Sequence, residues 1–413
     1  MRILHVHNFY QLPGGEDQSF AATGAMLEDF GHEVIRFTMR NDGIVGVGTL
    51  TAATKVVWNR AVHKELRGLI RRTRPDIAHF ENTFPLVSPA AYYACHAERL
   101  PVVQTLRNFR MVCPSGLLYR NGKICEDCLG RWTPWPGILH GCYRGNRLGT
   151  AAVAAMIATH RTIGTWHKHV DAYIALNAFV RAKYIQAGLA AEKLHINPNF
   201  LTSDPGPGGG EGGYALFAGR LSPEKGIETL LAAWDDLASE LPLKILGDGP
   251  QSNRVAEATA RHPSIEWLGW RPVEDVLNLI GGAKLVVVPS VCYESFNRTQ
   301  LEAFAKGTPV VASRQGSMQA IVEHQRTGLL FTPNDPNDLV RQVRWLLKSP
   351  ATYERMRLAA RAEFDRYYTT ALSHARLLRI YEAAREQMQQ TWPAPHSATM
   401  PKQLMPHKHR QSA

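Results

Sequence analysis

Residues 294–313 read Glu-Ser-Phe-Asn-Arg-Thr-Gln-Leu-Glu-Ala-Phe-Ala-Lys-Gly-Thr-Pro-Val-Val-Ala-Ser, a polar loop that turns into a helix and then into an apolar run. Residues 284–289 before it are apolar and β-branched, which is typical of a strand buried on both faces. A helix is predicted over residues 297–306, because Gly307 suits the position just past a helix end. This order predicts a parallel sheet with the loop at its carboxyl edge, where such sheets bind ligands.

Two carboxylates in this stretch are separated by seven residues. Glu294 falls in the loop, and Glu302 falls on the second turn of the predicted helix. The free N–H groups at a helix start favour an anion, and a carboxylate one turn later is placed to accept hydrogen bonds from a hydroxyl pair. The spacing alone is also compatible with solvated helix glutamates.

The chain opens with a second unit of the same kind. Residues 2–7 are predicted to form a strand, residues 19–30 a helix and residues 31–37 the next strand, which is a Rossmann-type opening. The loop between the first two contains Gly14 and Gly15. Glycines let a backbone approach a phosphate closely, although many such pairs only form a turn.

Composition limits the class of protein. The chain has 413 residues, enough for two domains, with 45% hydrophobic and 20% charged residues, as in globular proteins. No apolar stretch is long enough to span a membrane, and the first residues enter a strand rather than a signal peptide, so we expect a cytoplasmic protein. A net charge of +11 favours anionic partners such as nucleotide phosphates or lipid headgroups, and no nucleic-acid motif is present.

Six cysteines without a signal peptide indicate a reducing compartment. Four of them form the pattern C-x11-C-x2-C-x13-C, namely Cys113, Cys125, Cys128 and Cys142. Such a set can hold a structural zinc ion, which would not be catalytic because four sulfurs leave no open position. Buried, inert thiols are the alternative.

The letters around Glu294 and Glu302 resemble the retaining glycosyltransferases of the GT4 family (glycosyl transferases group 1). The resemblance implies the GT-B fold, an α/β fold in which two Rossmann-like domains face each other across a cleft. It implies that Glu294 lies by the transferred sugar and that Glu302 binds the nucleotide ribose. The string Gly-Arg-Leu-Ser-Pro-Glu-Lys-Gly at residues 219–226 is similar to the family's donor-diphosphate motif, which implies that Arg220 and Lys225 bind the diphosphate.

The resemblance also implies further contacts with a nucleoside-diphosphate sugar, without a catalytic metal. Gly14 and Gly15 would form a glycine-rich loop that meets the donor diphosphate and the acceptor, and Gly247 and Gly249 would form a tight turn beside the nucleotide. Trp270 would contact the base. The start of the helix predicted over residues 297–306 would contact phosphates through Ser295, Phe296 and Asn297.

Two positions depart from the family pattern. Arg107 stands where many relatives carry a histidine, and Asn297 stands where a glycine is usual. An arginine pairs with a phosphate or carboxylate, so Arg107 suggests an anionic group on donor or acceptor, with a plain surface arginine as the alternative. In the insertion that follows, Arg144 and Arg147 are candidates for an anionic or lipid-phosphate-linked acceptor, unless the insertion only packs on the core.

The expected organisation has two domains. Residues 1–200 form a Rossmann-like acceptor-binding domain with a Cys- and Trp-rich insertion at about 111–147, and residues 201–213 form a linker. Residues 214–370 form the nucleotide-sugar-binding domain. Residues 371–389 form a helix that crosses back to the first domain, and residues 390–413 form a disordered tail.

The predicted function is a retaining glycosyltransferase of the hexosyltransferase type. It moves a sugar from a nucleoside-diphosphate sugar to a hydroxyl of a glycan or lipid-linked acceptor, in cell-surface polysaccharide or glycoconjugate synthesis, in the cytoplasm or at the inner face of the membrane. Two alternatives stay open: a nucleotide-sugar epimerase of similar architecture, and a non-catalytic nucleotide-sugar-binding module.

Overall fold

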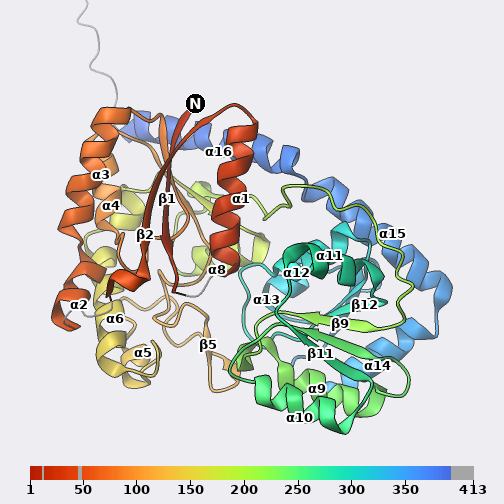
Figure 1. Ribbon diagram of the computed structural model, residues 1–413. Helices are drawn as coiled ribbons and strands as arrows, with labels where there is room; N and C mark the ends of the chain where they lie inside the picture. Colours follow the sequence, from red (N-terminus) through yellow and green to blue (C-terminus); the bar gives the residue numbers. More distant parts are fainter. Residues whose placement is uncertain (12–13, 45–48, 392–413) are drawn as a thin grey trace, which may run out of the picture.

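The computed structural model describes residues 1–11, 14–44 and 49–391, and the expected tail from residue 392 lies outside this range. The chain forms two α/β units, each built on a six-stranded sheet (Figure 1). All strand pairs within the two sheets are parallel. The predicted fold class is therefore confirmed.

The first sheet has the order β2-β1-β3-β4-β7-β8. Its four-residue central strands are wholly buried, because helices cover both faces. Its strands are β1 (Arg2–Phe9), β2 (Glu33–Arg40), β3 (Ile77–Phe80), β4 (Val102–Thr105), β7 (Ala172–Ala175) and β8 (Leu194–Ile196). Its helices are α1 (Gly15–Asp29), η1 (Asn41–Ile44), α2 (Thr49–Val57), α3 (Arg60–Thr73), α4 (Ala90–Ala97), α6 (Arg147–Thr162), α7 (Thr165–Lys168), α8 (Ala178–Gln186) and η2 (Ala191–Lys193).

The second sheet has the order β11-β10-β9-β12-β13-β14. Its strands are β9 (Ala215–Ala218), β10 (Leu243–Leu246), β11 (Ile265–Gly269), β12 (Leu285–Val288), β13 (Val310–Ser313) and β14 (Gly328–Phe331). Its helices are η3 (Pro223–Lys225), α9 (Ile227–Leu237), α10 (Ser252–Arg261), α11 (Val273–Gly282), α12 (Arg298–Ala305), α13 (Gly316–Ile321), α14 (Pro336–Leu347) and α15 (Pro350–Tyr367).

Residues 111–147 contain little regular structure. A two-residue pair, β5 (Tyr119–Arg120) and β6 (Lys123–Ile124), forms an antiparallel hairpin, and α5 (Trp135–Leu139) is a helix of five residues. In Figure 1 the hairpin side of this segment reaches toward the second unit.

Residues 201–213 have no helix or strand, as expected from their glycines and prolines. They are nevertheless held by backbone hydrogen bonds, including Gly208 N–H to Lys306 O at 2.8 Å and Gly210 N–H to Gly281 O at 2.9 Å. A Cβ on Gly208 would lie 2.2 Å from Gly281 O, so the glycine is needed for this close approach. The segment packs along the second unit.

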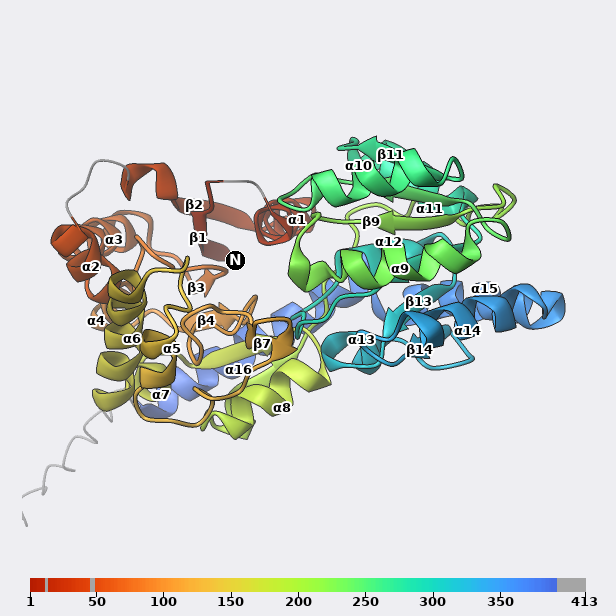
Figure 2. The same ribbon diagram turned by 90° about the horizontal axis from the view of Figure 1, so that it is seen from below.

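The last helix, α16 (Thr370–Thr391), lies on the first sheet, against β4, β7 and α1, rather than on the second (Figure 2). Tyr381 of this helix packs in the apolar cluster of the first unit, and its hydroxyl meets His79 Nδ1 at 2.9 Å. The chain from residue 350 onward thus forms two helices, α15 and α16, and α16 packs on the first unit. None of the helices in the described residues is long and apolar enough to cross a bilayer.

Candidate active site

The loop between β12 and α12 lies at the carboxyl edge of the second sheet. Asn297 caps α12, because its backbone is extended and its side-chain oxygen accepts a hydrogen bond from Gln300 N at 3.2 Å. Asparagine is among the best helix-capping residues, which accounts for its presence at this position. Phe296 points into the apolar core, so only its backbone faces the loop.

Glu294 and Lys225 form an ion pair at the centre of this loop. Lys225 Nζ lies 2.7 Å from Glu294 Oε1, and the two side chains are 26% and 9% exposed. Ser290 Oγ donates to the same carboxylate oxygen at 2.5 Å, and Asn297 Nδ2 at 3.3 Å. Burial opposes ionisation of Glu294, but Lys225 and these donors lower its pKa overall. Burial likewise opposes the charged ammonium, yet the carboxylate raises the pKa of Lys225. Both groups are therefore charged at neutral pH.

Lys225 reaches this position through a shaped turn. It ends η3, and Gly226 follows with a φ of 74°. A Cβ on Gly226 would lie 2.0 Å from Pro289 O, so only glycine lets the two loops meet. A backbone hydrogen bond from Val291 N–H to Glu224 O, at 2.9 Å, joins them again. The loops after β9 and β12 are thus one connected surface.

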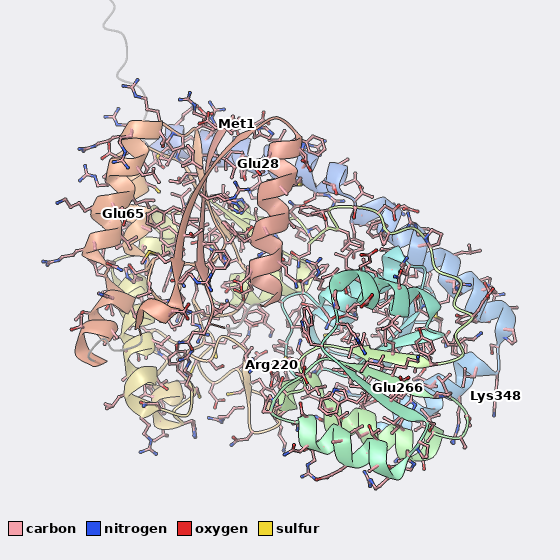
Figure 3. The ribbon with its side chains drawn as sticks, in the orientation of Figure 1. Met1, Glu28, Glu65, Arg220, Glu266 and Lys348 are labelled. Atoms are coloured by element: carbon pink, nitrogen blue, oxygen red, sulfur yellow. The ribbon has the colours of Figure 1, made fainter. Side chains whose placement is uncertain are left out.

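Arg220 follows β9 and is exposed. Figure 3 shows it on the side of the second unit that faces the first. In the part of the chain that the structure describes, its guanidinium has no ion pair or hydrogen bond. The sequence-predicted cations therefore lie on adjacent turns of one loop, one of them paired with Glu294 and the other open to a ligand.

Glu302 is buried on α12, and its carboxylate is bonded to Arg298 Nε at 2.8 Å. Burial raises the pKa of Glu302 above its ordinary value, although Arg298 acts in the opposite direction. Sequence reasoning missed Arg298 as a partner, although an i, i+4 Arg–Glu spacing is a signal for such a pair. A hydroxyl pair at this carboxylate would have to share it with the guanidinium.

Gly247 and Gly249 follow β10 and approach the chain itself. Gly247 has a φ of 119°, and a Cβ there would lie 2.0 Å from Gly219 O. At Gly249 a Cβ would lie 2.4 Å from Leu221 O. Both glycines therefore let this turn pack closely against the Arg220 loop. Trp270 lies after the edge strand β11 and is 73% exposed.

In the first unit, Gly14 and Gly15 begin α1. Gly14 N–H donates to Asp17 Oδ2 at 3.0 Å, and Asp17 Oδ1 lies 2.7 Å from His7 Nε2. A Cβ on either glycine would meet no atom within 4 Å, so this turn is open.

Arg107 is buried and internally paired, which corrects both expectations for it. Its Nε donates to Glu81 Oε2 at 2.7 Å, and its Nη1 donates to Asn199 Oδ1. Burial opposes ionisation of Glu81, but Arg107 and His5 hold its pKa well below the ordinary value. The charge of Arg107 is thus balanced from within, so it is neither a surface residue nor a free anion binder.

Glu81 is also the centre of a buried cluster that sequence reasoning missed. His5 Nε2 and His79 Nε2 lie 3.6 and 3.8 Å from Glu81 Oε1, and all three side chains are buried. Burial lowers the pKa of His79 to about 3, so this histidine is neutral. His5 and His79 come from strands that are far apart in the sequence. The apolar pattern of these strands does not indicate that the two histidines meet Glu81.

The two units meet at the Glu294 loop. Ser295 Oγ donates to Arg107 O, and Asn177 Nδ2 donates to Ser295 O at 2.8 Å. Arg107 of the first unit and Ser295 of the second are therefore in direct contact. Arg144 and Arg147 lie exposed before and at the start of α6, and in the described residues neither contacts these loops.

A cavity opens in the first unit beside Arg107. Sequence reasoning did not find Arg110, whose guanidinium lies 4.6 Å from the Phe84 ring centroid and 5.3 Å from that of Tyr143. Polar and apolar groups from the ends of β3 and β4 line the cavity together. Its lining includes Asn82, Phe84, Gln104, Arg107, Asn108 and Arg110.

Comparison with known proteins gives a consistent result. Residues 208–363 match the model of the family described as glycosyl transferases group 1. Over 188 residues the chain is 33% identical to a glycogen synthase of Mycobacterium tuberculosis, covering 43% of this chain and 44% of that protein. Over 219 residues it is 28% identical to the sulfoquinovosyl transferase SQD2 of Arabidopsis thaliana, covering 49% and 42%. The match thus spans less than half the length of these relatives.

Solved structures resemble the whole chain. Anabaena HepE, crystallised with UDP and glucose, superposes with a TM-score of 0.63 at 18% identity, covering 92% of this chain and 99% of that one. Sucrose-phosphate synthase from Thermosynechococcus elongatus gives a TM-score of 0.63 at 18% identity, covering 93% and 99%. These likenesses establish the GT-B arrangement of the two units. The match to the glycosyl transferases group 1 family thus covers residues 208–363, which include the loops of Arg220, Lys225 and Glu294.

Proposed function

We propose that this protein is a retaining glycosyltransferase that moves a sugar from a nucleoside-diphosphate sugar to a hydroxyl of a glycan or lipid-linked acceptor. The observation that carries the proposal is the loop pair after β9 and β12. It holds the paired Lys225 and Glu294 beside the unpaired Arg220, on the side of the second unit that faces the first.

The proposed chemistry depends on charge. Negative charge builds on the departing nucleoside diphosphate as the sugar–phosphate bond breaks. Arg220 and Lys225 stabilise that charge, and the N–H groups at the start of α12 add to it. Removing one such group typically raises the barrier by roughly 3 kcal/mol, or about a hundredfold in rate. Glu294 orients the sugar hydroxyls and keeps Lys225 in place.

In the proposal, the configuration at the anomeric carbon is retained because the acceptor hydroxyl attacks the same face of the sugar that the phosphate leaves. Glu294 is the carboxylate nearest the proposed sugar position, and its ion pair with Lys225 makes it a poor covalent nucleophile. The departing phosphate oxygen therefore accepts the proton of the acceptor hydroxyl. Glu302, held by Arg298, binds the nucleotide ribose, and Trp270 and the backbone at residues 295–297 complete the donor site.

The acceptor enters from the first unit in this proposal. The cavity beside Arg107 and Arg110 takes its polar end, and the open turn at Gly14 and Gly15 borders the transferred sugar. The exposed Arg144 and Arg147 and the net charge of +11 suit an anionic, lipid-linked acceptor at the inner face of the membrane. Cell-surface polysaccharide or glycoconjugate synthesis is the corresponding setting.

A donor screen tests the proposal. UDP-, GDP- and ADP-sugars are incubated with the protein, and protection from heat unfolding identifies the donor. HepE was crystallised with UDP and with UDP-glucose, so UDP-glucose is the first donor to try. Arg220→Ala should abolish most of the protection, whereas Arg254→Ala, on the exposed face of α10, should leave it unchanged.

Turnover then separates the reaction classes. With donor alone, a transferase releases nucleoside diphosphate only slowly, whereas an epimerase converts the sugar. A binding module gives protection without any turnover on a panel of glycan and lipid-linked acceptors. Epimerised donor, or protection that survives Arg220→Ala, would contradict the proposal.

A further inference from the structure

The four cysteines of residues 111–147 meet in space. Cys113, Cys125, Cys128 and Cys142 all line one small cavity between the hairpin and α5. All four are free thiols in the structure. They reach the cavity from three separate turns of the segment, so a single bound ion would join these turns.

The surrounding segment has few other means of holding its shape. Its regular structure is a hairpin with two residues in each strand and one helix of five residues. Several of its residues have the left-handed backbone of turns, including Leu118, Asn121 and Arg144. Segments too small to bury their own core are commonly fixed by disulfides or by a structural metal.

Backbone hydrogen bonds preset the turns that carry the sulfurs. Cys125 N–H bonds Leu118 O at 2.9 Å, directly after the hairpin, and Leu129 N–H bonds Glu126 O at 2.9 Å. Cys142 N–H bonds Gly137 O at 3.0 Å at the end of α5. The C-x2-C pair therefore lies on one turn, as in known zinc sites.

The sulfurs do not yet form a closed tetrahedron. Among the described residues, the group of three metal-ligating side chains whose ligand atoms all lie within 4.8 Å of one another is His5, His79 and Glu81. That buried group is already neutralised by Arg107, which makes it a poor cation site. Zinc binding at the cysteines therefore requires their side chains to rotate about the cavity that they line.

Cationic side chains lie beside the cysteines. Four thiolates around a divalent ion leave two negative charges to be balanced. Arg120 lines the same cavity and donates to Asp127 Oδ2 at 2.9 Å, and Arg161 lies near enough to Cys128 for their charges to interact. Asp127 also lines the cavity and pairs with Arg120, so Arg161 is the cation that would balance the thiolates.

We propose that Cys113, Cys125, Cys128 and Cys142 bind one zinc ion as four thiolates. Binding releases four protons to solvent and leaves the ion without an open position, so the site is structural. No oxidation is involved.

The ion has a second consequence, which rests on the proposed function. Glu126 lies inside the C-x2-C turn, and its carboxylate pairs with Lys183 Nζ at 2.6 Å. It also lies beside the Tyr293 hydroxyl, where burial together with this carboxylate raises the pKa of Tyr293 to about 12. Tyr293 precedes Glu294 in the chain. The zinc ion therefore fixes Glu126 against the loop of the second unit that carries the proposed donor site.

Metal content tests the site independently of activity. The full chain is incubated with ZnCl2, desalted and analysed for metal by mass spectrometry. We expect about one zinc per chain, and six titratable thiols after unfolding in chelator without reductant. Less than a tenth of an equivalent, with any number of thiols, would overturn the proposal. So would an equivalent of another metal, or fewer than six thiols, which would indicate disulfides.

Variants give a matched comparison. Cys128→Ser should lose most of the zinc, whereas Cys95→Ser, in the core of the first unit, should keep it. Should Cys128→Ser not fold, chelator treatment of the unmodified chain replaces it: the Tm should fall, and ZnCl2 but not CaCl2 should restore it. A Tm that chelator leaves unchanged would refute a structural role. A protein that binds zinc but has no transferase activity would contradict only the proposed function.

Discussion

The ion pair between Lys225 and Glu294 allows structure and catalysis to be separated in one set of variants. Lys225→Met keeps the length of the side chain but removes the ammonium, leaving the nearly buried Glu294 carboxylate with Ser290 and Asn297 as its donors. Breaking a fully buried pair typically costs about 3–5 kcal/mol. Because Lys225 is 26% exposed and two donors remain, we expect about 2 kcal/mol.

Glu294→Gln should cost less, about 1 kcal/mol, since the Lys225 ammonium can turn toward water. The double variant removes both charges, so it should be more stable than Lys225→Met alone: a coupling of about 2 kcal/mol would leave it about 1 kcal/mol less stable than the unmodified chain. For domains of this size 1 kcal/mol shifts Tm by about 2–4 °C, so Lys225→Met should unfold about 4–8 °C below the unmodified chain.

Heat unfolding of the four proteins at pH 7, with turnover measured in parallel, is the assay. Stability should partly return in the double variant, whereas turnover should remain about a hundredfold low, because the leaving diphosphate has still lost its cation. An unchanged Tm in Lys225→Met, or strictly additive losses in the double variant, would refute the buried pair. Recovered turnover in the double variant would refute the role of Lys225.

The same pair has a defined pH range. The pKa of Glu294 is lowered, so its contribution is present above about pH 5 and is lost as the pH falls through the folded-state value. The pKa of Lys225 is raised, so its contribution is present below about pH 10 and is lost as the pH rises above that. The stability difference between the unmodified chain and the double variant should be constant between these limits.

Three further predictions concern the fold. Gly247→Ala should cost more than about 3 kcal/mol by denaturant unfolding, from its φ of 119° and the clash with Gly219 O, whereas Gly15→Ala should be neutral or stabilising. Glu81→Gln should cost about 3–5 kcal/mol by unpairing buried Arg107, whereas Glu28→Gln, in an exposed pair, should cost under about 1 kcal/mol; equal losses would contradict this. Burial raises the pKa of Asp171 to about 6, so stability should fall by about 2 kcal/mol as the pH rises from 4 to 7, and Asp171→Asn should flatten that slope.

Local patterns in the sequence predicted the strands and the capped central helix correctly. The start of α12 could be read from its flanking residues, because capping depends on neighbours within one turn. The glycine at 226 and the Lys225 turn were likewise evident as a motif, although the reason for the glycine, the carbonyl of Pro289, lies in the loop after β12.

Pairings between distant residues could not be predicted. Arg107 meets Glu81 only because β3 and β4 are neighbours in the sheet, and His5 joins them from β1. The register of the strands brings these side chains to the same end of the sheet, and the register cannot be derived from the spacing of residues in the sequence. For the same reason, the sequence does not indicate the cavity beside Arg110. The contact between Gly247 and the carbonyl of Gly219 is likewise a pairing that the motif does not indicate.

The position of α16 bears on how the protein is made. The first sheet is complete in the chain by Ile196, yet the helix that covers it is the last element that the structure describes. During synthesis the opening half must therefore leave the ribosome with an uncovered apolar face, and keep it until residue 391 has emerged. A premature stop within the closing helix would harm the part of the protein that was translated first.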